Sequence, residues 1–210
     1  FCVLVGLTVG AQAGTKAGSA PEPVNSRDLA IMTKAFKAMD LGKWSEVKSL
    51  ESKTKDPLAR KLIQWGRLSS YSGPAEFDEL SAFLYNNPQW PRSLRINAKA
   101  EARLSATEAD DVVLAWFTGR QPVTALGKAR YAVALLNRGD KKDEDRATAM
   151  LRDAWINGDF SKADEKHFMG RHGKRLRTSD HIARLDRLLW EGRYWAVRRH
   201  LWRVPKAYQK

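Results

Sequence analysis

The sequence has little cysteine, and its single Cys2 lies among the first apolar residues. One cysteine excludes an intramolecular disulfide and a cysteine-based zinc site. β-Branched aliphatic residues are also few, because Val and Ile number 16 against 49 for Ala and Leu. This imbalance favours helix over strand. The sequence contains no glycine-rich phosphate loop, no H-E-x-x-H and no paired carboxylate cluster, so we expect no metal and no cofactor.

Acidic residues are scarce relative to basic ones. The sequence has 24 Asp and Glu residues and 37 Lys and Arg residues, which gives a net charge of +13. Such a charge favours a polyanionic partner, whether nucleic acid, a membrane surface or an acidic polymer. The excess is uneven, because residues 171–210 hold 12 basic and 3 acidic residues, a net +9. With 43% hydrophobic and 29% charged residues, the chain is neither disordered nor a polytopic membrane protein.

The chain begins with an apolar run over residues 1–10, followed by Ala11-Gln12-Ala13. An apolar stretch before an A-x-A site is typical of a secretory signal peptide. The run is about half the roughly 20 residues of a spanning helix, which argues against stable membrane insertion. We therefore expect a signal-peptide remnant over 1–13, a flexible linker over 14–26, and export. A buried strand or helix end is the alternative for residues 1–10.

Apolar residues recur at helical spacing over residues 27–204, between proline and glycine stops. We predict an all-α fold, a right-handed superhelix (α-solenoid) of tetratricopeptide-like helix pairs with roughly ten helices. A compact helical bundle is the alternative. We expect residues 205–210 to be a truncated C-terminal tail. Asp56-Pro57 predicts a helix N-cap and first turn. Glycines that follow apolar runs predict left-handed residues at helix ends: Gly42, Gly119, Gly139, Gly158 and Gly192.

Basic and aromatic residues alternate on the last two predicted helices. The members of each arginine pair, three or four residues apart, share a helix face, and tryptophans are interleaved with them. One interpretation is a surface for an anionic polymer. The other is an ordinary helix surface, whose arginines pair with Asp180, Asp186 and Glu191 or with another domain. The candidate glycan or interdomain contacts are Arg184, Arg187, Trp190, Arg199 and Arg203.

Other residues carry weaker signals for chemistry. The four histidines, His167, His172, His181 and His200, are spaced by 5, 9 and 19 residues, which fits no metal motif. Exposed or helix-capping histidines are the expectation. A lone carboxylate such as Glu101 is expected on a solvated helix face.

Three segments, FDELSAFLYNNPQWPRSLRINAKAE (77–101), AWFTGRQPVTALGKARYAVALLNRGD (115–140) and AWINGDF…RLDRLLWEGRYWAVRRHL (154–201), carry a family resemblance. They resemble the soluble lytic murein transglycosylases of alphaproteobacterial type. The first matches a helix–NPxWP–helix signature and the second a W-F-x-x-x-x-P-x-T-x-x-G-K block. The third matches a long run from AW-x-x-GDF through DH to RLDRLLWEGR. The likeness covers nearly the whole chain, and its last block is the most specific.

The resemblance implies the superhelical scaffold of a periplasmic enzyme that cleaves the β-1,4 bond between MurNAc and GlcNAc, leaving a 1,6-anhydromuramoyl end. It implies that a separate, lysozyme-like catalytic domain carries the active site. That domain's Glu-Ser motif and later G-L-M-Q block are not matched here, because Glu51-Ser52 is followed by Lys53 and no G-L-M-Q occurs. No catalytic residue is therefore carried over, and this chain alone is expected to be inactive.

The resemblance also implies partners: peptidoglycan glycan strands and the catalytic domain, with no nucleic acid. Asp180-His181 and the segment from Arg184 to Arg187 match its motif and are expected to lock adjacent helices together. Two other hypotheses stay open. One is a non-enzymatic helical-repeat adaptor for a protein partner in the cell envelope, and the other is a cytoplasmic nucleic-acid-binding protein.

Overall fold

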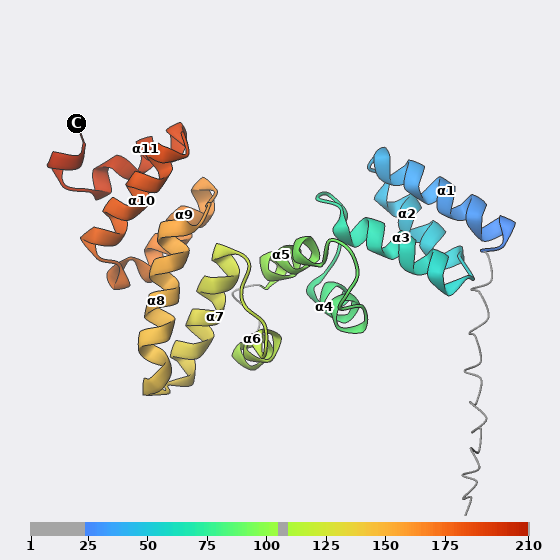
Figure 1. The fold of residues 1–210 in the computed structure, drawn as a ribbon, viewed down its shortest axis with the longest axis horizontal. Helices are drawn as coiled ribbons and strands as arrows, with labels where there is room; N and C mark the ends of the chain where they lie inside the picture. The colour runs from blue at the N-terminus through green and yellow to red at the C-terminus, as the bar shows by residue number, and fades with distance from the viewer. Residues whose placement is uncertain (1–23, 105–108, 210) are drawn as a thin grey trace, which may run out of the picture.

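The predicted all-α class is confirmed by the computed structural model, which describes residues 24–104 and 109–209. Within these residues the regular elements are eleven α-helices and three short 3-10 helices (Figure 1). The predicted signal-peptide remnant and most of the predicted linker lie outside the described residues. The α-helices are α1 (Ser26–Asp40), α2 (Trp44–Lys53), α3 (Pro57–Ser69), α4 (Phe77–Asn86), α5 (Ser93–Arg103), α6 (Asp110–Phe117), α7 (Ala125–Arg138), α8 (Lys141–Asn157), α9 (Lys162–His172), α10 (Thr178–Trp190) and α11 (Tyr194–His200). The 3-10 helices are η1 (Gly173–Arg175), η2 (Leu201–Arg203) and η3 (Lys206–Tyr208).

Several helix starts follow from local capping chemistry. The Asp56 carboxylate accepts the backbone N–H of Ala59 at 2.8 Å, with Pro57 in the first turn, as predicted. The Asn25 side chain caps α1 in the same way, accepting the N–H of Asp28 at 2.9 Å. The predicted linker over 14–26 is therefore wrong at its end, because the first helix cap is already made at Asn25.

Glycine ends several helices in the left-handed conformation. Gly42, Gly119, Gly139 and Gly192 have φ between 66° and 77°, as predicted. The prediction is wrong for Gly158, whose φ is −89°. That position needs glycine for space instead, since a Cβ there would lie 2.3 Å from both Ala125 Cβ and the Ala154 carbonyl oxygen.

The helices form an elongated array in which most pack on their neighbours in sequence. Figure 1 shows α1–α3 at one end, α4–α7 in the middle and α8–α11 at the other end. The main packed pairs are α1 with α2 and α3, α4 with α5, α7 with α6 and α8, and α10 with α8 and α11. This is the packing of a stacked helical array. The right-handed sense of the superhelix stays a prediction.

The apolar core follows the array in two parts. A small cluster, Ala35, Ala38, Val47 and Ile63, joins α1, α2 and α3. A larger one runs from Leu68 at the end of α3 to Phe168 in α9. None of the described helices is both long enough and apolar enough to cross a membrane.

A buried arginine joins the first three-helix group to α4. Arg67 of α3 pairs with Glu51 of α2 at 3.0 Å and with Glu79 of α4. Its guanidinium also donates to the Pro74 carbonyl at 2.8 Å. The hydrogen bond from Arg67 holds the pKa of Glu79 below its usual range. Glu51 of the Glu51-Ser52 pair is thus committed to an ion pair.

Two side chains of α5, Lys99 and Glu101, connect this helix to α3 and to α7. Lys99 Nζ donates to the carbonyls of Leu68, Ser70 and Gly73 at 2.5–3.2 Å around the end of α3. Burial lowers the pKa of Lys99 to about 8. The Lys99 ammonium group thus caps carbonyl groups at the C-terminal end of α3.

Glu101 lies on the same helix as Lys99, and it is buried rather than solvated, contrary to expectation. Its carboxylate accepts the backbone N–H groups of Val123 and Thr124 at 2.8 and 2.7 Å, and the Thr124 hydroxyl at 2.6 Å. Burial raises the pKa of Glu101, although these hydrogen bonds favour the charged form. The Thr124 hydroxyl in turn caps α7 by accepting the Gly127 N–H. Glu101 therefore fixes α7 on α5.

Removing the Arg67 side chain should destabilise the chain strongly. Arg67→Ala leaves two carboxylates without their cation, and we expect the free energy of unfolding to fall by about 3–5 kcal/mol. Arg95→Ala, at an exposed arginine of α5, is the control and should change it by less than about 0.5 kcal/mol. Urea denaturation followed by circular dichroism measures both. Equal stability of the two variants would contradict a joint at Arg67.

Candidate binding surface at the C-terminal helices

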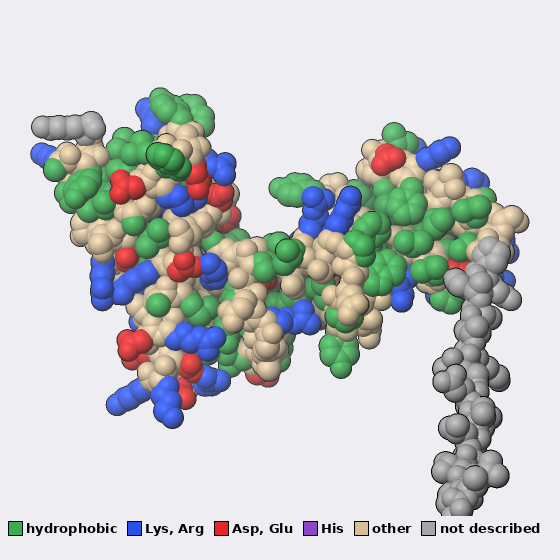
Figure 2. All heavy atoms as spheres, viewed as in Figure 1, with side chains coloured by type: hydrophobic (Ala, Val, Ile, Leu, Met, Phe, Trp, Pro, Cys, Tyr) green, Lys and Arg blue, Asp and Glu red, His purple; other side chains and the backbone are tan. Residues whose placement is uncertain are grey.

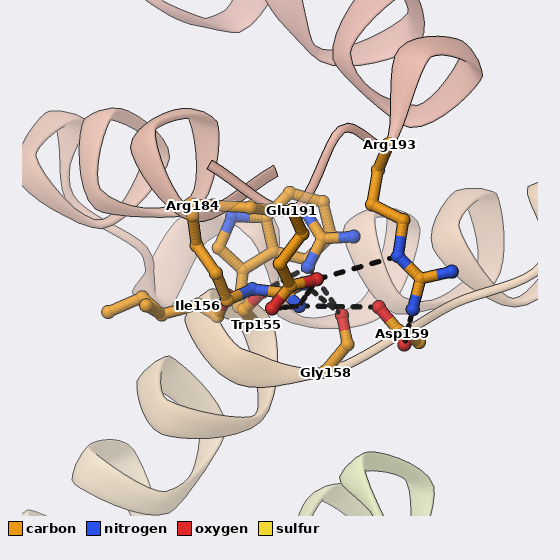
Figure 3. Close-up of polar contacts among 8 residues, drawn as sticks. Trp155, Ile156, Gly158, Asp159, Arg184, Glu191 and Arg193 are labelled. Carbon is orange, nitrogen blue, oxygen red and sulfur yellow. Dashed lines mark hydrogen bonds and ion pairs between the residues drawn. The ribbon is translucent and has the colours of Figure 1, made fainter. Parts of the chain in front are cut away.

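The end of α8 is fastened to α10 by a buried arginine. The Arg184 guanidinium lies over the Trp155 ring at 4.4 Å and is only 1% exposed. Its Nη1 donates to the carbonyls of Trp155 and of Gly158, the latter at 2.8 Å (Figure 3). Burial lowers the pKa of Arg184 to about 10, so the group stays cationic at neutral pH. A helix C-terminus carries a partial negative charge that suits this cation.

A second arginine and its neighbours extend the same joint to the surface. Arg187 donates to the Ile156 and Gly158 carbonyls at 2.8 and 3.0 Å. It also pairs with Glu191 at 2.9 Å and with Asp159 at 3.3 Å. Arg193, just after the α10 turn, pairs with Asp159 at 2.9 Å. Figure 3 shows Glu191 and Arg193 beside Gly158 and Asp159 of the loop after α8.

Beneath this joint lies a cluster of rings around Trp155. Its indole stacks on Phe168 of α9 at 5.4 Å and donates to His181 Nδ1 of α10 at 3.2 Å. His200 of α11 lies 5.6 Å from the Trp155 ring, and its Nε2 contacts the His181 carbonyl oxygen at 2.8 Å. Four helices thus share one aromatic centre. The expectation of exposed histidines is wrong for His200, which is fully buried.

Asp180 strengthens the lock between α8 and α10. Its carboxylate accepts the Arg177 backbone N–H at 2.7 Å at the start of α10 and lies 3.5 Å from Arg152 of α8. Asp180 and His181 therefore both tie neighbouring helices together, which is the role expected of them.

Large aromatic side chains at the C-terminal end of the array are exposed to solvent. Trp190 is 93% exposed, Trp202 71%, Trp195 69% and Tyr194 61%. Three arginines accompany these four residues, and Figure 2 shows hydrophobic and basic side chains together over α10 and α11. Exposed aromatic groups of this kind mark binding surfaces. We call the set the arginine–aromatic surface: Trp190, Arg193, Tyr194, Trp195, Arg198 and Trp202, with the largely buried Arg203 beside Trp202.

Cation–π contacts order part of this surface. The Arg203 guanidinium lies 4.1 Å from the Trp202 ring. Arg198 lies 5.7 Å from Trp195 and 5.8 Å from Tyr194, whose rings meet edge-to-face at 5.1 Å. Such contacts stabilise an arginine beside a flat apolar face.

The five predicted contact residues separate into two groups. Trp190 lies on the exposed surface, as the prediction requires. Arg184 is wrong as a surface contact, because its guanidinium is buried under Trp155. Arg187 is held by carbonyls and by Glu191, and this last pair matches the alternative interpretation.

Arg199 and Arg203 both pair with buried Glu165 of α9, at 3.3 and 3.2 Å. Their guanidinium groups therefore help to hold α9 against α11 and η2. Sequence reasoning missed Tyr194 and Arg198, although their spacing of four residues on one helix was a readable signal.

The described residues contain no group of three or more histidines, cysteines or carboxylates placed to hold a metal ion. Glu51 and Glu101, the carboxylates considered at the outset, are bound by Arg67 and by the start of α7. The arrangement suits recognition of a ligand by stacking and charge rather than proton transfer.

The sequence matches no family model and no curated protein, and the fold matches no solved structure. The function is therefore inferred from the residues and their geometry.

Acid should loosen the ring cluster. Burial lowers the pKa of His200 to about 4, against 6.5 for a free histidine. As pH falls below 6.5, the unfolded chain therefore binds a proton that the folded chain excludes, and stability drops until about pH 4. His200→Gln keeps a donor for the His181 carbonyl. Because this variant lacks the titrating imidazole, its free energy of unfolding should fall by about 2 kcal/mol less between pH 7 and pH 5 than that of the unsubstituted chain. Urea denaturation at both pH values measures this.

The matched control for His200→Gln is His167→Gln, at an exposed histidine of α9. If both variants lose stability on acidification as the unsubstituted chain does, His200 is not the titrating group.

Proposed function

We propose that this chain is the helical scaffold of a peptidoglycan lytic transglycosylase and binds glycan strands through its arginine–aromatic surface. One observation carries the proposal: residues of the long resembling run, distant in sequence, are in mutual contact. Trp155 donates to His181, and Arg184 donates to Gly158. The separate parts of the long resembling run therefore meet in one joint, as expected of a structural motif.

The chemistry of the surface fits the proposed polymer. Flat indole faces offer large apolar areas against which sugar rings can pack. The exposed guanidinium of Arg198 can attract and hydrogen-bond the carboxylates of peptidoglycan stem peptides. The net +9 over residues 171–210 extends this attraction beyond direct contact.

The bond-breaking step belongs, in this proposal, to a separate catalytic domain. There a single glutamate protonates the β-1,4 bond and the muramoyl C6 hydroxyl attacks internally, giving the 1,6-anhydro end. The scaffold's contribution is to hold an exported enzyme on the cell-wall polymer. For an exported protein, the anionic partner of the basic residues would be the cell-wall polymer and not nucleic acid.

Sedimentation with purified sacculi tests the binding half of the proposal. The chain should sediment with sacculi at about 50 mM salt and be released at about 500 mM, where charges are screened. Trp190→Ala/Trp195→Ala should weaken binding by about tenfold or more, because two stacking faces are lost. The control is Tyr71→Ala/Tyr85→Ala, which removes two exposed aromatics, 99% and 79% exposed, elsewhere on the chain.

Two results would overturn the binding proposal. Absence of sedimentation at low salt would favour the non-enzymatic adaptor for a protein partner. Equal binding by the tryptophan and tyrosine variants would separate glycan binding from the arginine–aromatic surface.

Product analysis tests the catalytic half. Sacculi incubated with the chain should release no 1,6-anhydromuropeptides, measured by chromatography and mass spectrometry. Release of these products would contradict the assignment of catalysis to a separate domain.

A further inference from the structure

A cavity of about 470 Å³ lies between α7 and α9, bordered by the end of α5 and the start of α6. Its volume falls in the range of small-molecule sites. One wall is apolar and comes mainly from α7, with Leu126, Ala129 and Val133. This cavity is separate from the arginine–aromatic surface.

The opposite wall has an unusual composition for an array helix. Five residues of α9 line the cavity at helical spacing: Asp164, His167, Phe168, Arg171 and His172. A helix in such an array normally turns apolar residues inward at these positions. Here only Phe168 is apolar and buried, whereas His167 and Arg171 are exposed. The helix α9 therefore presents basic side chains at the solvent-facing edge of the cavity.

The acidic groups around the cavity are already engaged. Asp110 accepts from Arg130 at 2.6 Å and from Asn137 at 2.8 Å. Asp164 accepts from the Ser161 hydroxyl at 2.7 Å. Glu101 is held by the start of α7. The carboxylates therefore have their positive or polar partners within the protein.

The basic groups of α9 are in a different situation. Arg171 and His167 make no hydrogen bond or ion pair to any residue within 24–104 or 109–209. His172 contacts Phe168 ring-to-ring at 5.1 Å, and burial lowers the pKa of His172 to about 4. Its neutral imidazole can both donate and accept. The cavity is thus supplied with uncommitted donors beside an apolar wall.

We propose that this cavity binds a small amphipathic anion. Its apolar body would lie against the α7 wall, and its carboxylate or phosphate would accept hydrogen bonds from Arg171 and His167. This site is independent of glycan binding and stands even if the proposed scaffold function is wrong.

An NMR titration of the ¹⁵N-labelled chain tests the site. Phenyl phosphate and benzoate are the anionic probes, and benzyl alcohol is the neutral probe of similar shape. We expect saturable shifts of backbone amides in α7 and α9 with at least one anion, and several-fold weaker binding of the alcohol. Comparison of the two anions then identifies the preferred head group.

Two variants locate the binding. Arg171→Gln, at an exposed position, should weaken binding of the anion by about tenfold, because one charge-assisted hydrogen bond is lost. Ala102→Trp, also exposed and lining the cavity, should block it sterically. Arg95→Gln, an exposed arginine on α5, is the control and should bind as the unsubstituted chain does.

Circular dichroism verifies that each variant remains folded. Three results would overturn the proposal: no saturable shift with either anion, equal affinity for benzyl alcohol, or unchanged affinity in Arg171→Gln. Loss of sacculus binding in the tryptophan variant leaves these outcomes unaffected, so the two proposals fail separately.

Discussion

The array depends on a few charged side chains, buried or half-buried, that hydrogen-bond the backbone between successive helix groups. Hydrophobic contact is nearly non-directional, so apolar stripes alone leave the angle between successive helix groups loosely defined. Arg67, Lys99, Glu101 and Arg184 each contact the backbone at a helix end or in the loop beside it. A buried charge without its partners is costly, and this cost selects one geometry at each joint.

The joint at Arg184 has a direct consequence for the binding surface. Trp155 lies beneath the guanidinium and contacts rings from α9, α10 and α11. The last helices are therefore held by one centre while Trp190 and Trp195 remain in solvent. For the proposed glycan contact, a base that is packed in advance would lower the conformational cost of binding.

Local features were predictable from sequence, whereas the joints were not. Asp56-Pro57 and Gly139 act within a single turn, so their roles follow from neighbouring residues. Glu101 is buried by residues more than twenty positions later, and no local pattern distinguishes it from a solvated glutamate. The helix α9 buries only Phe168 among its apolar residues, so apolar periodicity alone does not indicate it.

Most of the packing joins helices that are adjacent or next but one in sequence, such as α7 with α8 and α8 with α10. A change at one joint reaches a distant helix group only through the joints between them, because the main contacts join α-helices no more than two apart in sequence. Small differences of the same sense at successive joints would add along the array. The position of one end relative to the other is therefore set by all the joints together.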